Sequence, residues 1–520
     1  MKDISFYIKK NKVFCISIGF LLILVAMGIF IPSPFGSFTS KITESITRDF
    51  GWFYLLLVTG ILFYLFYLIV SPIGQIKLGN PDSKPDHSTA SWVAMMFSAG
   101  MGIGLVFYGA AEPLSHYAIN SPMADVSTNK ALADSFQYTF FHWGIHAWGV
   151  YAIVGLALAY FGFRKQEEYL LSATFKPLLG DKSDGFIAKV IDTITIVATV
   201  IGVATTLGFG ASQINGGLSY LFGIPNNFKV QTIIIIITTL LFILSAMSGL
   251  GKGVKILSNL NLILAIGLLA LAIVVGPSVK IFDNLTDSLG NYMHNFLAMS
   301  FRSSSFDPTK RGWINMWTIF YWAWWISWSP FVGVFIARIS KGRTIREFLT
   351  VVLLVPSILS FLWFTAFGTL STNIQASGFD LTGFATEEVL FATFSHYNLG
   401  NIMSLVALVL IISFFVTSAD SATFVLAMLS ENGKLNPSNK KKLVWGGLLA
   451  VIAIALLFSG GLTALENTLI IVALPFSLVI IFMMVSLLIE LNHEKDKMGL
   501  SITPDRLPKK NKPFKSYTEE

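Results

Sequence analysis

Four tryptophans stand close together in the stretch YWAWWISW, which begins at Tyr321. Trp324 and Trp328 are one helical turn apart, and Trp325 lies three residues before Trp328, so three indole rings share one sector of a helix. Aromatic faces attract a cation that has no hydrogen-bond donor, such as a quaternary ammonium group, by ~2 kcal/mol or more after desolvation. The cluster therefore predicts a site for such a compound, and the alternative is bulk for helix packing.

A second aromatic group stands in FHWGIHAWGVY. At about 100° per residue, Trp143, Trp148 and Tyr151 project from one face of a helix. His142 and His146 are one turn apart and could relay protons, although we favour a satisfied polar contact or a position at the extracellular end for them. This segment by itself is weaker evidence than the tryptophan stretch.

The glycines of SAGMGIG, residues 98–104, alternate along an apolar segment. Each costs a helix roughly 1 kcal/mol relative to alanine, so we expect the helix to break here. Inside a membrane, a break is tolerated where the freed backbone groups line a cavity or bind an ion or substrate. The alternative is close helix packing through Gly100 and Gly104, which is compatible with a break because packing does not require Gly102.

Oxygen-bearing side chains gather in FFVTSADS, residues 414–421. Thr417, Ser418 and Asp420 fall near the middle of an apolar segment, where an ionisable residue is a functional hypothesis by default. Hard alkali cations prefer oxygen ligands, so the segment is a candidate site for such an ion. The alternatives are hydrogen bonds from the hydroxyls to the preceding turn and a structural pairing of Asp420 with a helix end or an arginine.

The elements that position these residues are membrane helices. Of the 520 residues, 54% are hydrophobic and 12% are charged, which is the composition of an integral membrane protein. The stretch 313–338 places the tryptophans at mid-depth, away from the interfaces where membrane tryptophans usually anchor helices. Twelve apolar runs are long enough to cross a ~30 Å hydrocarbon core, at about 13–31, 52–72, 91–111, 137–162, 188–220, 230–250, 256–276, 313–338, 348–372, 401–428, 442–461 and 467–490.

Basic residues predict the orientation of these helices. With the N-terminus inside, the clusters at 338–346 and 440–442 and the tail after Glu490 are cytoplasmic, so both termini are expected in the cytoplasm. This bias accounts for the net charge of +7 without nucleic acid as a partner, and the basic tail is of the kind that attracts anionic lipid. The single Cys15 excludes a disulfide framework, and no HExxH motif or carboxylate–histidine cluster indicates an enzyme.

The motifs GMGIGLVFYGAAEP, FHWGIHAWGVYAIVGLALAY, YWAWWISWSPFVGVFIARISKGRTIREF and FFVTSADSATFVL together resemble the betaine/carnitine/choline transporter (BCCT) family, over essentially the whole chain. The resemblance implies an all-α integral membrane protein of twelve transmembrane helices, with a LeuT-type inverted repeat of five plus five helices after two extra helices. It also implies a homotrimer in the cytoplasmic membrane. The expected segments are two leading helices at 1–90, the first repeat at 91–276, an outer amphipathic helix and loop at 277–312, the second repeat at 313–490 and a basic cytoplasmic tail at 491–520.

The resemblance also assigns roles to residues. The substrate's ammonium group would lie in an aromatic box formed by Trp143, Trp148, Tyr151 and Trp325. Two more tryptophans, Trp324 and Trp328, would line the inward path. The substrate's carboxylate would meet backbone groups of Met101, Gly102 and Gly104. Sodium would bind backbone carbonyls and hydroxyls of Ser98, Met101, Phe414, Thr417 and Ser418. A second sodium site is only partly matched, because Thr199 and Phe331 agree with it whereas Val203 replaces a threonine.

The expected function is sodium symport of a quaternary ammonium zwitterion by alternating access, for osmoprotection, with sodium as the coupling ion and no cofactor. Choline-preferring members tend to carry an acidic residue at the position of Gly104, so we expect glycine betaine first, with proline betaine or carnitine next. The alternatives are a choline or carnitine transporter, or a sodium-independent exchanger of the same family. A channel or a membrane-embedded enzyme fits the motifs less well.

Overall fold

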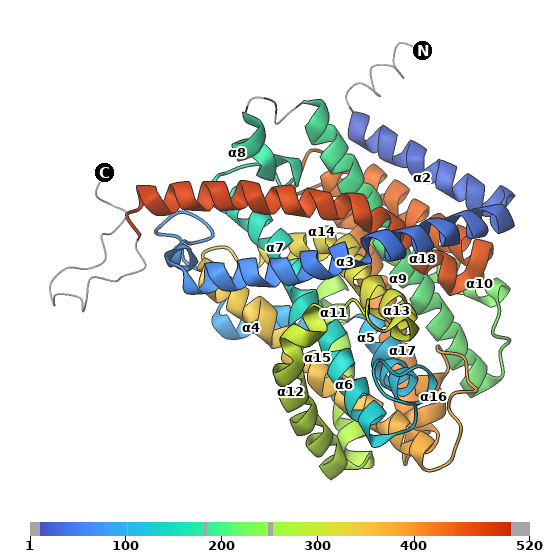
Figure 1. Ribbon diagram of the computed structural model, residues 1–520. Coiled ribbons are helices and arrows are strands. Elements are labelled where there is room, and N and C mark those ends of the chain that lie inside the picture. Colours follow the sequence, from blue (N-terminus) through green and yellow to red (C-terminus); the bar gives the residue numbers. More distant parts are fainter. Residues whose placement is uncertain (1–10, 101, 181, 183–184, 248–252, 501–520) are drawn as a thin grey trace, which may run out of the picture.

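The computed structural model describes residues 11–100, 102–180, 182, 185–247 and 253–500, and helices make up most of this part of the chain (Figure 1). The long helices are α2 (Lys12–Phe30), α3 (Pro32–Val70), α9 (Phe186–Phe222), α10 (Phe228–Met247), α11 (Gly253–Val275), α12 (Ser278–Ser300), α14 (Phe320–Arg338), α15 (Ile345–Ala376), α17 (Gly400–Leu429) and α18 (Asn439–Lys497). The shorter helices are α4 (Thr89–Gly100), α5 (Ile103–Leu114), α6 (Asn129–Trp143), α7 (Ile145–Ala159), α8 (Lys176–Leu179), α13 (Pro308–Trp313) and α16 (Val389–Phe394). Wider π-helical turns follow α5, α7 and α13 at Ser115–Ile119 (η2), Tyr160–Arg164 (η3) and Ile314–Ile319 (η6).

Ten helical stretches in the described residues are long and apolar enough to cross a membrane, so the protein is a multi-pass membrane protein. The sequence predicts twelve, and the difference has two causes. The third run is divided into α4 and α5, each of 12 residues, and α18 joins the last two runs across a kink. At the kink, Gly461 has φ 63°, a left-handed conformation that glycine adopts at little cost. The count of twelve crossings and the five-plus-five repeat stay predictions.

Helix breaks shape the centre of the molecule. The backbone is extended at Gly102, between α4 and α5, with φ −159° and ψ 178°, so the glycine-rich segment does interrupt its helix. A second break, at Gly144, separates α6 from α7 and was not predicted from the sequence. The prediction that Trp143, Trp148 and Tyr151 project from one face of a single helix is therefore wrong, because Trp143 ends α6 whereas the other two residues lie on α7. At Gly144, glycine is required by space, because an added β-carbon would lie 2.5 Å from the carbonyl oxygen of Phe140. The first break turns the amino end of α5 toward the interior.

The predicted amphipathic helix in the segment 277–312 is α12, which spans Ser278–Ser300 and packs against α6 and α15 (Figure 1). Its inward face buries Ile281 and Tyr292, while Phe282 and Met293 stay exposed. The next helical stretch starts at Pro308, a few residues before the predicted start at 313.

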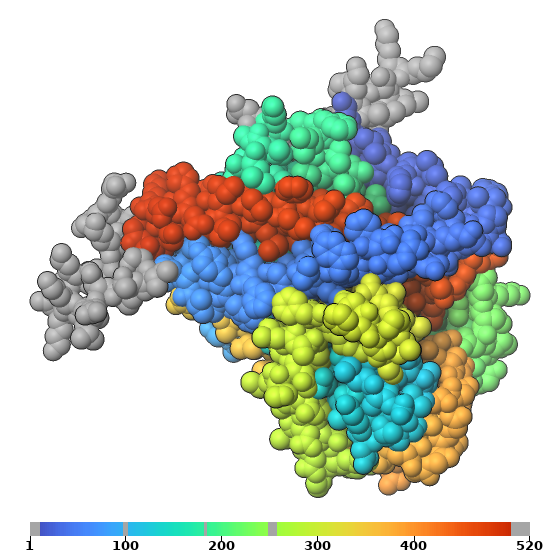
Figure 2. Space-filling model, viewed as in Figure 1, coloured from blue at the N-terminus to red at the C-terminus, as the bar shows by residue number. Residues whose placement is uncertain are grey.

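Helices α3 and α18 lie side by side across the upper part of the face shown in Figure 2. The Tyr54 hydroxyl donates to the carbonyl of Ile470 at 3.0 Å, and the Tyr64 hydroxyl donates to that of Met484 at 3.2 Å. Behind this layer, α14 packs on α7 and α9 packs on α17. These four helices, with α5 and α11, surround the central cavity.

Candidate functional site

A cavity of about 500 Å³ lies at the centre of the helix bundle, and its lining comes from segments far apart in the sequence. Most of the predicted site residues line it: Gly102, Gly104, Trp143, Trp148, Tyr151, Trp324, Trp325, Trp328, Phe331, Phe414, Thr417 and Ser418. Met101 and the side chain of Ser98 lie outside the residues that the structure describes. Thr199 does not line the cavity, since it lies buried in α9 with its hydroxyl donating to the carbonyl of Thr195 at 2.7 Å.

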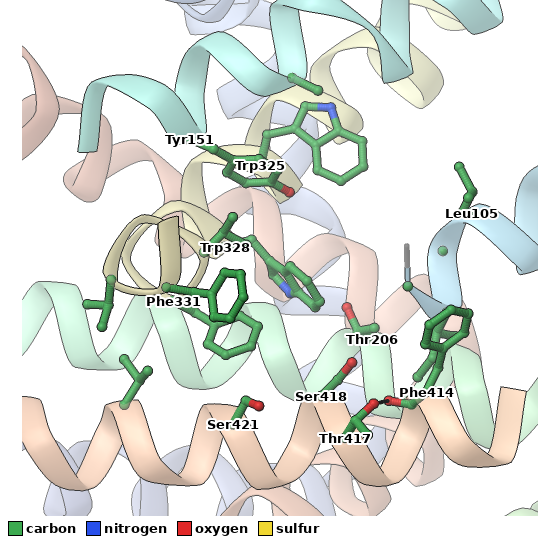
Figure 3. Close-up of a pocket in the computed structure, with 18 of the residues that line it drawn as sticks. Leu105, Tyr151, Thr206, Trp325, Trp328, Phe331, Phe414, Thr417, Ser418 and Ser421 are labelled. Carbon is green, nitrogen blue, oxygen red and sulfur yellow. Dashed lines mark hydrogen bonds between the residues drawn. The ribbon is translucent and has the colours of Figure 1, made fainter. Parts of the chain in front are cut away.

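One wall of the cavity is aromatic. The rings of Trp324 and Trp325 are stacked with centroids 5.1 Å apart, and the Trp143 ring meets Trp325 edge-on at 5.0 Å. Tyr151 lies 5.9 Å from Trp325 and 5.3 Å from Trp148, and Figure 3 shows Tyr151 and Trp325 adjoining at the cavity. The two aromatic groups found separately in the sequence therefore form a single surface, which we call the aromatic wall.

Hydrogen bonds hold these indoles in place. The Trp325 Nε1 donates to the carbonyl of His142 at 2.9 Å, which lies at the break between α6 and α7. Trp324 donates to the Thr206 hydroxyl in α9 at 3.2 Å. Because the indole nitrogens of Trp324 and Trp325 have fixed partners, these two rings are held in position before any ligand binds.

The opposite wall is polar and comes from α17. Thr417, Ser418 and Ser421 line the cavity, facing Trp328 from α14 (Figure 3). The Thr417 hydroxyl donates to the carbonyls of Ser413 at 3.0 Å and Phe414 at 3.3 Å, which are the hydrogen bonds to the preceding turn that the sequence analysis gave as an alternative. Asn261 in α11 donates its Nδ2 to the Thr417 hydroxyl at 3.1 Å, and its Oδ1 is buried without a hydrogen-bond partner in the described part of the chain. Hydroxyl, carbonyl and unpaired amide oxygens suit a hard cation such as sodium. The residues present thus fit a sodium ion on this side.

The cavity reaches the molecular surface at one end. Trp328 packs against Phe331 at 5.3 Å, and farther along α14 the lining includes the exposed Arg338. The Arg338 guanidinium lies 5.1 Å above the ring of Phe424. At the other end, Tyr108 packs 6.1 Å from Trp324 and covers the aromatic wall.

His142 and Asp420 lie outside the cavity lining, and their hydrogen bonds test the contacts predicted for them from the sequence. His142 makes the satisfied polar contact that we favoured, with its Nδ1 2.8 Å from Oε1 of Glu112 and its Nε2 3.0 Å from the Thr318 hydroxyl. His146 is only partly satisfied, because its Nε2 lies 2.9 Å from the Ser300 hydroxyl while its buried Nδ1 has no partner among the described residues. Asp420 accepts from the Ser245 hydroxyl in α10 at 2.6 Å, so its observed partner is a serine rather than a helix end or an arginine.

Glu112 and Tyr321, which adjoin the aromatic wall from behind, were not predicted from the sequence. The expectation of no carboxylate–histidine cluster is also wrong, because Glu112, His116 and His142 meet in the folded protein. Tyr321 stacks on Trp325 at 5.5 Å and donates its hydroxyl to Glu112. A signal was present, because a carboxylate at the end of an apolar run is a functional hypothesis by default. It was not used because Glu112 stands next to Pro113 and reads as the end of a helix.

Membrane-length helices around a central cavity, with an interrupted helix directed at it, define a membrane transport protein for a small solute. The match to a family model agrees with this class. The chain belongs to the betaine/carnitine/choline family of transporters (BCCT), whose model matches residues 12–496.

Similar proteins support the same assignment. The glycine betaine transporter OpuD of Bacillus subtilis is 54% identical over 98% of this chain and 99% of its own length. A probable glycine betaine transporter of Desulfitobacterium hafniense is 42% identical over 92% of this chain and 97% of its own, and an ectoine/hydroxyectoine transporter of Virgibacillus pantothenticus is 41% identical over 92% and 95%. The solved structure of MhsT in complex with L-phenylalanine is 14% identical, covers 76% of this chain and 89% of its own, and has a TM-score of 0.47, which is too weak to assign the fold.

Proposed function

We propose that the protein imports glycine betaine, or a related quaternary ammonium zwitterion, together with sodium for osmoprotection. The observation that carries this proposal is the aromatic wall, where Trp324 and Trp325 are stacked and Trp143 meets them edge-on. A trimethylammonium group offers no hydrogen-bond donor, and stacked indole faces attract it by ~2 kcal/mol or more after desolvation. The similarity to OpuD of Bacillus subtilis supports the same substrate class.

The charges around the cavity favour a zwitterion over choline. The described residues that line it include Arg338 but no aspartate or glutamate, so no carboxylate of the lining would pair with the substrate's ammonium group. A zwitterion brings its own carboxylate, which the amino end of α5 is suited to accept. The first-turn N–H groups of a helix, here at Ile103 and Gly104, have no intrahelical acceptor and carry a partial positive charge.

Sodium would bind at the polar wall. The hydroxyls of Thr417 and Ser418 and the carbonyl of Phe414 are the ligands we assign to it, with Ser98 and Met101 contributing backbone carbonyls across the helix break. An ion held there would connect α17 to the segment that meets the substrate carboxylate, which couples the two binding events. An inward membrane potential would contribute ~2.3 kcal/mol per charge per 100 mV to accumulation.

The family resemblance motivates the remaining parts of the proposal. We expect a homotrimer in the cytoplasmic membrane with both termini in the cytoplasm, and a basic tail that contacts anionic lipid. In this orientation the Arg338 end of the cavity is the cytoplasmic end. Alternating access would then open the aromatic wall outward by movement of one helix bundle against the other.

The deciding experiment is uptake of radiolabelled glycine betaine into proteoliposomes with inward sodium or potassium gradients. Choline, carnitine and ectoine serve as competitors, and the variants are Trp325→Ala and Trp52→Ala. Trp52 is the matched control because it lies on α3, 52% exposed and outside the cavity lining. We expect sodium-dependent uptake that Trp325→Ala abolishes and Trp52→Ala retains.

Other results would redirect the assignment. Uptake that ignores sodium but requires substrate inside the vesicles would make the protein an exchanger. Competition by choline stronger than that by glycine betaine would contradict the preference for a zwitterion. No betaine flux in reconstituted, folded protein would refute the substrate assignment itself.

A further inference from the structure

A fully buried carboxylate lies directly behind the aromatic wall. Glu112, near the end of α5, has an exposed fraction of 0%. Its Oε2 accepts from the Trp143 Nε1 at 2.7 Å and from the Tyr321 hydroxyl. Its Oε1 lies 2.8 Å from His142 Nδ1 and 3.2 Å from His116 Nε2. Four groups that can donate hydrogen bonds therefore converge on one carboxylate.

The arrangement of hydrogens favours a carboxylate anion between two neutral imidazoles. The Trp313 Nε1 donates to Nδ1 of His116 at 3.3 Å, so the hydrogen of that ring is on Nε2, facing Glu112. The Thr318 hydroxyl lies 3.0 Å from Nε2 of His142 and can donate to it, which leaves a hydrogen on Nδ1, also facing Glu112. In the described residues, no lysine or arginine forms an ion pair with Glu112.

The same hydrogens argue against a metal centre. Glu112, His116 and His142 offer three possible ligand atoms within 4.8 Å of one another. A metal needs a lone pair from each imidazole nitrogen that faces it. The indole of Trp313 directs a hydrogen rather than a lone pair of His116 toward Glu112. The cluster is therefore a hydrogen-bonded support for a carboxylate.

We propose that Glu112 strengthens binding of the substrate's ammonium group by acting through Trp143. This inference rests on the function proposed above. The Trp143 N–H donates to Glu112 on one side, while its ring lines the cavity and meets Trp325 at 5.0 Å on the other. A carboxylate that accepts from an indole N–H shifts electron density onto the ring, and cation–π attraction grows with the negative charge of the ring face. Glu112 is thus a positioning residue that never touches the substrate.

The position of Glu112 also suits a zwitterion. Eight residues of helix separate it from Gly104, which corresponds to ~12 Å at 1.5 Å per residue. The amino end of α5 would attract the substrate's carboxylate, while the buried anion near the other end of α5 would attract its ammonium group. Because the negative charge lies behind an indole, it repels the substrate's carboxylate less than an acidic residue in the lining would.

The test compares two ligands of one shape. In 3,3-dimethylbutanoate a neutral carbon replaces the ammonium nitrogen of glycine betaine, so the ratio of the two dissociation constants reports recognition of the positive charge. We would measure both by calorimetry for the wild-type protein, Glu112→Gln and Trp313→Phe. The last is the matched control, since it removes a hydrogen bond from the same cluster but keeps the carboxylate.

We expect the wild-type protein to prefer glycine betaine and Glu112→Gln to reduce that preference about tenfold, equivalent to ~1.4 kcal/mol. Trp313→Phe should leave the ratio within about twofold of the wild-type value, because the charge of Glu112 is retained. If Glu112→Gln does not fold, Trp143→Phe keeps a ring but lacks the N–H group, and it should also reduce the ratio.

Three results would overturn the inference. Equal weakening of both ligands in Glu112→Gln would show that Glu112 only supports the structure. An unchanged ratio in Glu112→Gln, or in Trp143→Phe if that variant has to be used, would show that the charge is not felt at the site. Failure of the wild-type protein to bind glycine betaine would overturn the proposed function, and this inference with it.

Discussion

Gly104 is the position where a single methyl group is expected to disturb the site most. A β-carbon added there would lie 2.8 Å from Cη2 of Trp324 and 2.9 Å from Cη2 of Trp143. Carbon atoms normally approach to ~3.5–4.0 Å, so both rings would have to move. Each is anchored, Trp143 to Glu112 at 2.7 Å and Trp324 to Thr206 at 3.2 Å. Gly104→Ala would therefore strain a hydrogen bond or push an indole into the cavity.

The expected size of this effect follows from the packing. An extra methyl group in a well-packed site costs about 1–3 kcal/mol. If the cost falls on the aromatic wall, the dissociation constant for glycine betaine rises by about five- to 140-fold, at ~1.4 kcal/mol per factor of ten. Local helix propensity acts in the opposite direction, since alanine stabilises a helix by about 1 kcal/mol relative to glycine. A loss of affinity would thus reflect crowding of the rings rather than the helix itself.

Calorimetric titration of glycine betaine into purified Gly104→Ala tests this prediction. Gly267→Ala in α11 is the matched control, because an added β-carbon there has no neighbour within 4 Å. We expect the control to bind as the wild-type protein does. Gly104→Ala protein that is folded and monodisperse yet binds within twofold of the wild-type affinity would refute the reasoning.

Three further predictions concern coupling and stability. Thr417→Ala should raise the sodium concentration for half-maximal uptake at least tenfold. Ser413→Ala should not, because the Ser413 hydroxyl donates to the carbonyl of Leu410 and lies outside the cavity lining. Equal sodium titrations of the two variants would contradict Thr417 as a ligand. Thr199→Val should leave the Hill coefficient for sodium unchanged, because that hydroxyl donates to Thr195 and does not line the cavity; a lower coefficient would indicate a second sodium. Arg343→Met should lower the melting temperature, because the guanidinium lies 4.5 Å above the Trp92 ring and donates to the His87 carbonyl. These contacts are worth about 2 kcal/mol. An unchanged melting curve would refute their contribution to stability.

Local sequence patterns were enough to locate most of the long helices and the break at Gly102, but not the break at Gly144. Long apolar runs form helices because a membrane offers backbone groups no other hydrogen-bond partners. The spacing of Gly100, Gly102 and Gly104 predicted the break between α4 and α5, because successive glycines weaken one segment of helix. The spacing of the tryptophans in α14 likewise predicted that their rings share one side.

The tertiary structure alone decided which residues meet. Trp143, the last residue of α6, and Trp325, in α14, are 182 positions apart. Their rings meet because α7, which follows α6 after the break at Gly144, packs against α14. The role of Glu112 depends on four donors from other turns and helices, which no local period encodes. Thr199 matched a family pattern, yet the packing of α9 places it outside the cavity lining. Sequence periodicity indicates which residues share one face of a helix. The residues that this face contacts depend on long-range packing of the whole bundle.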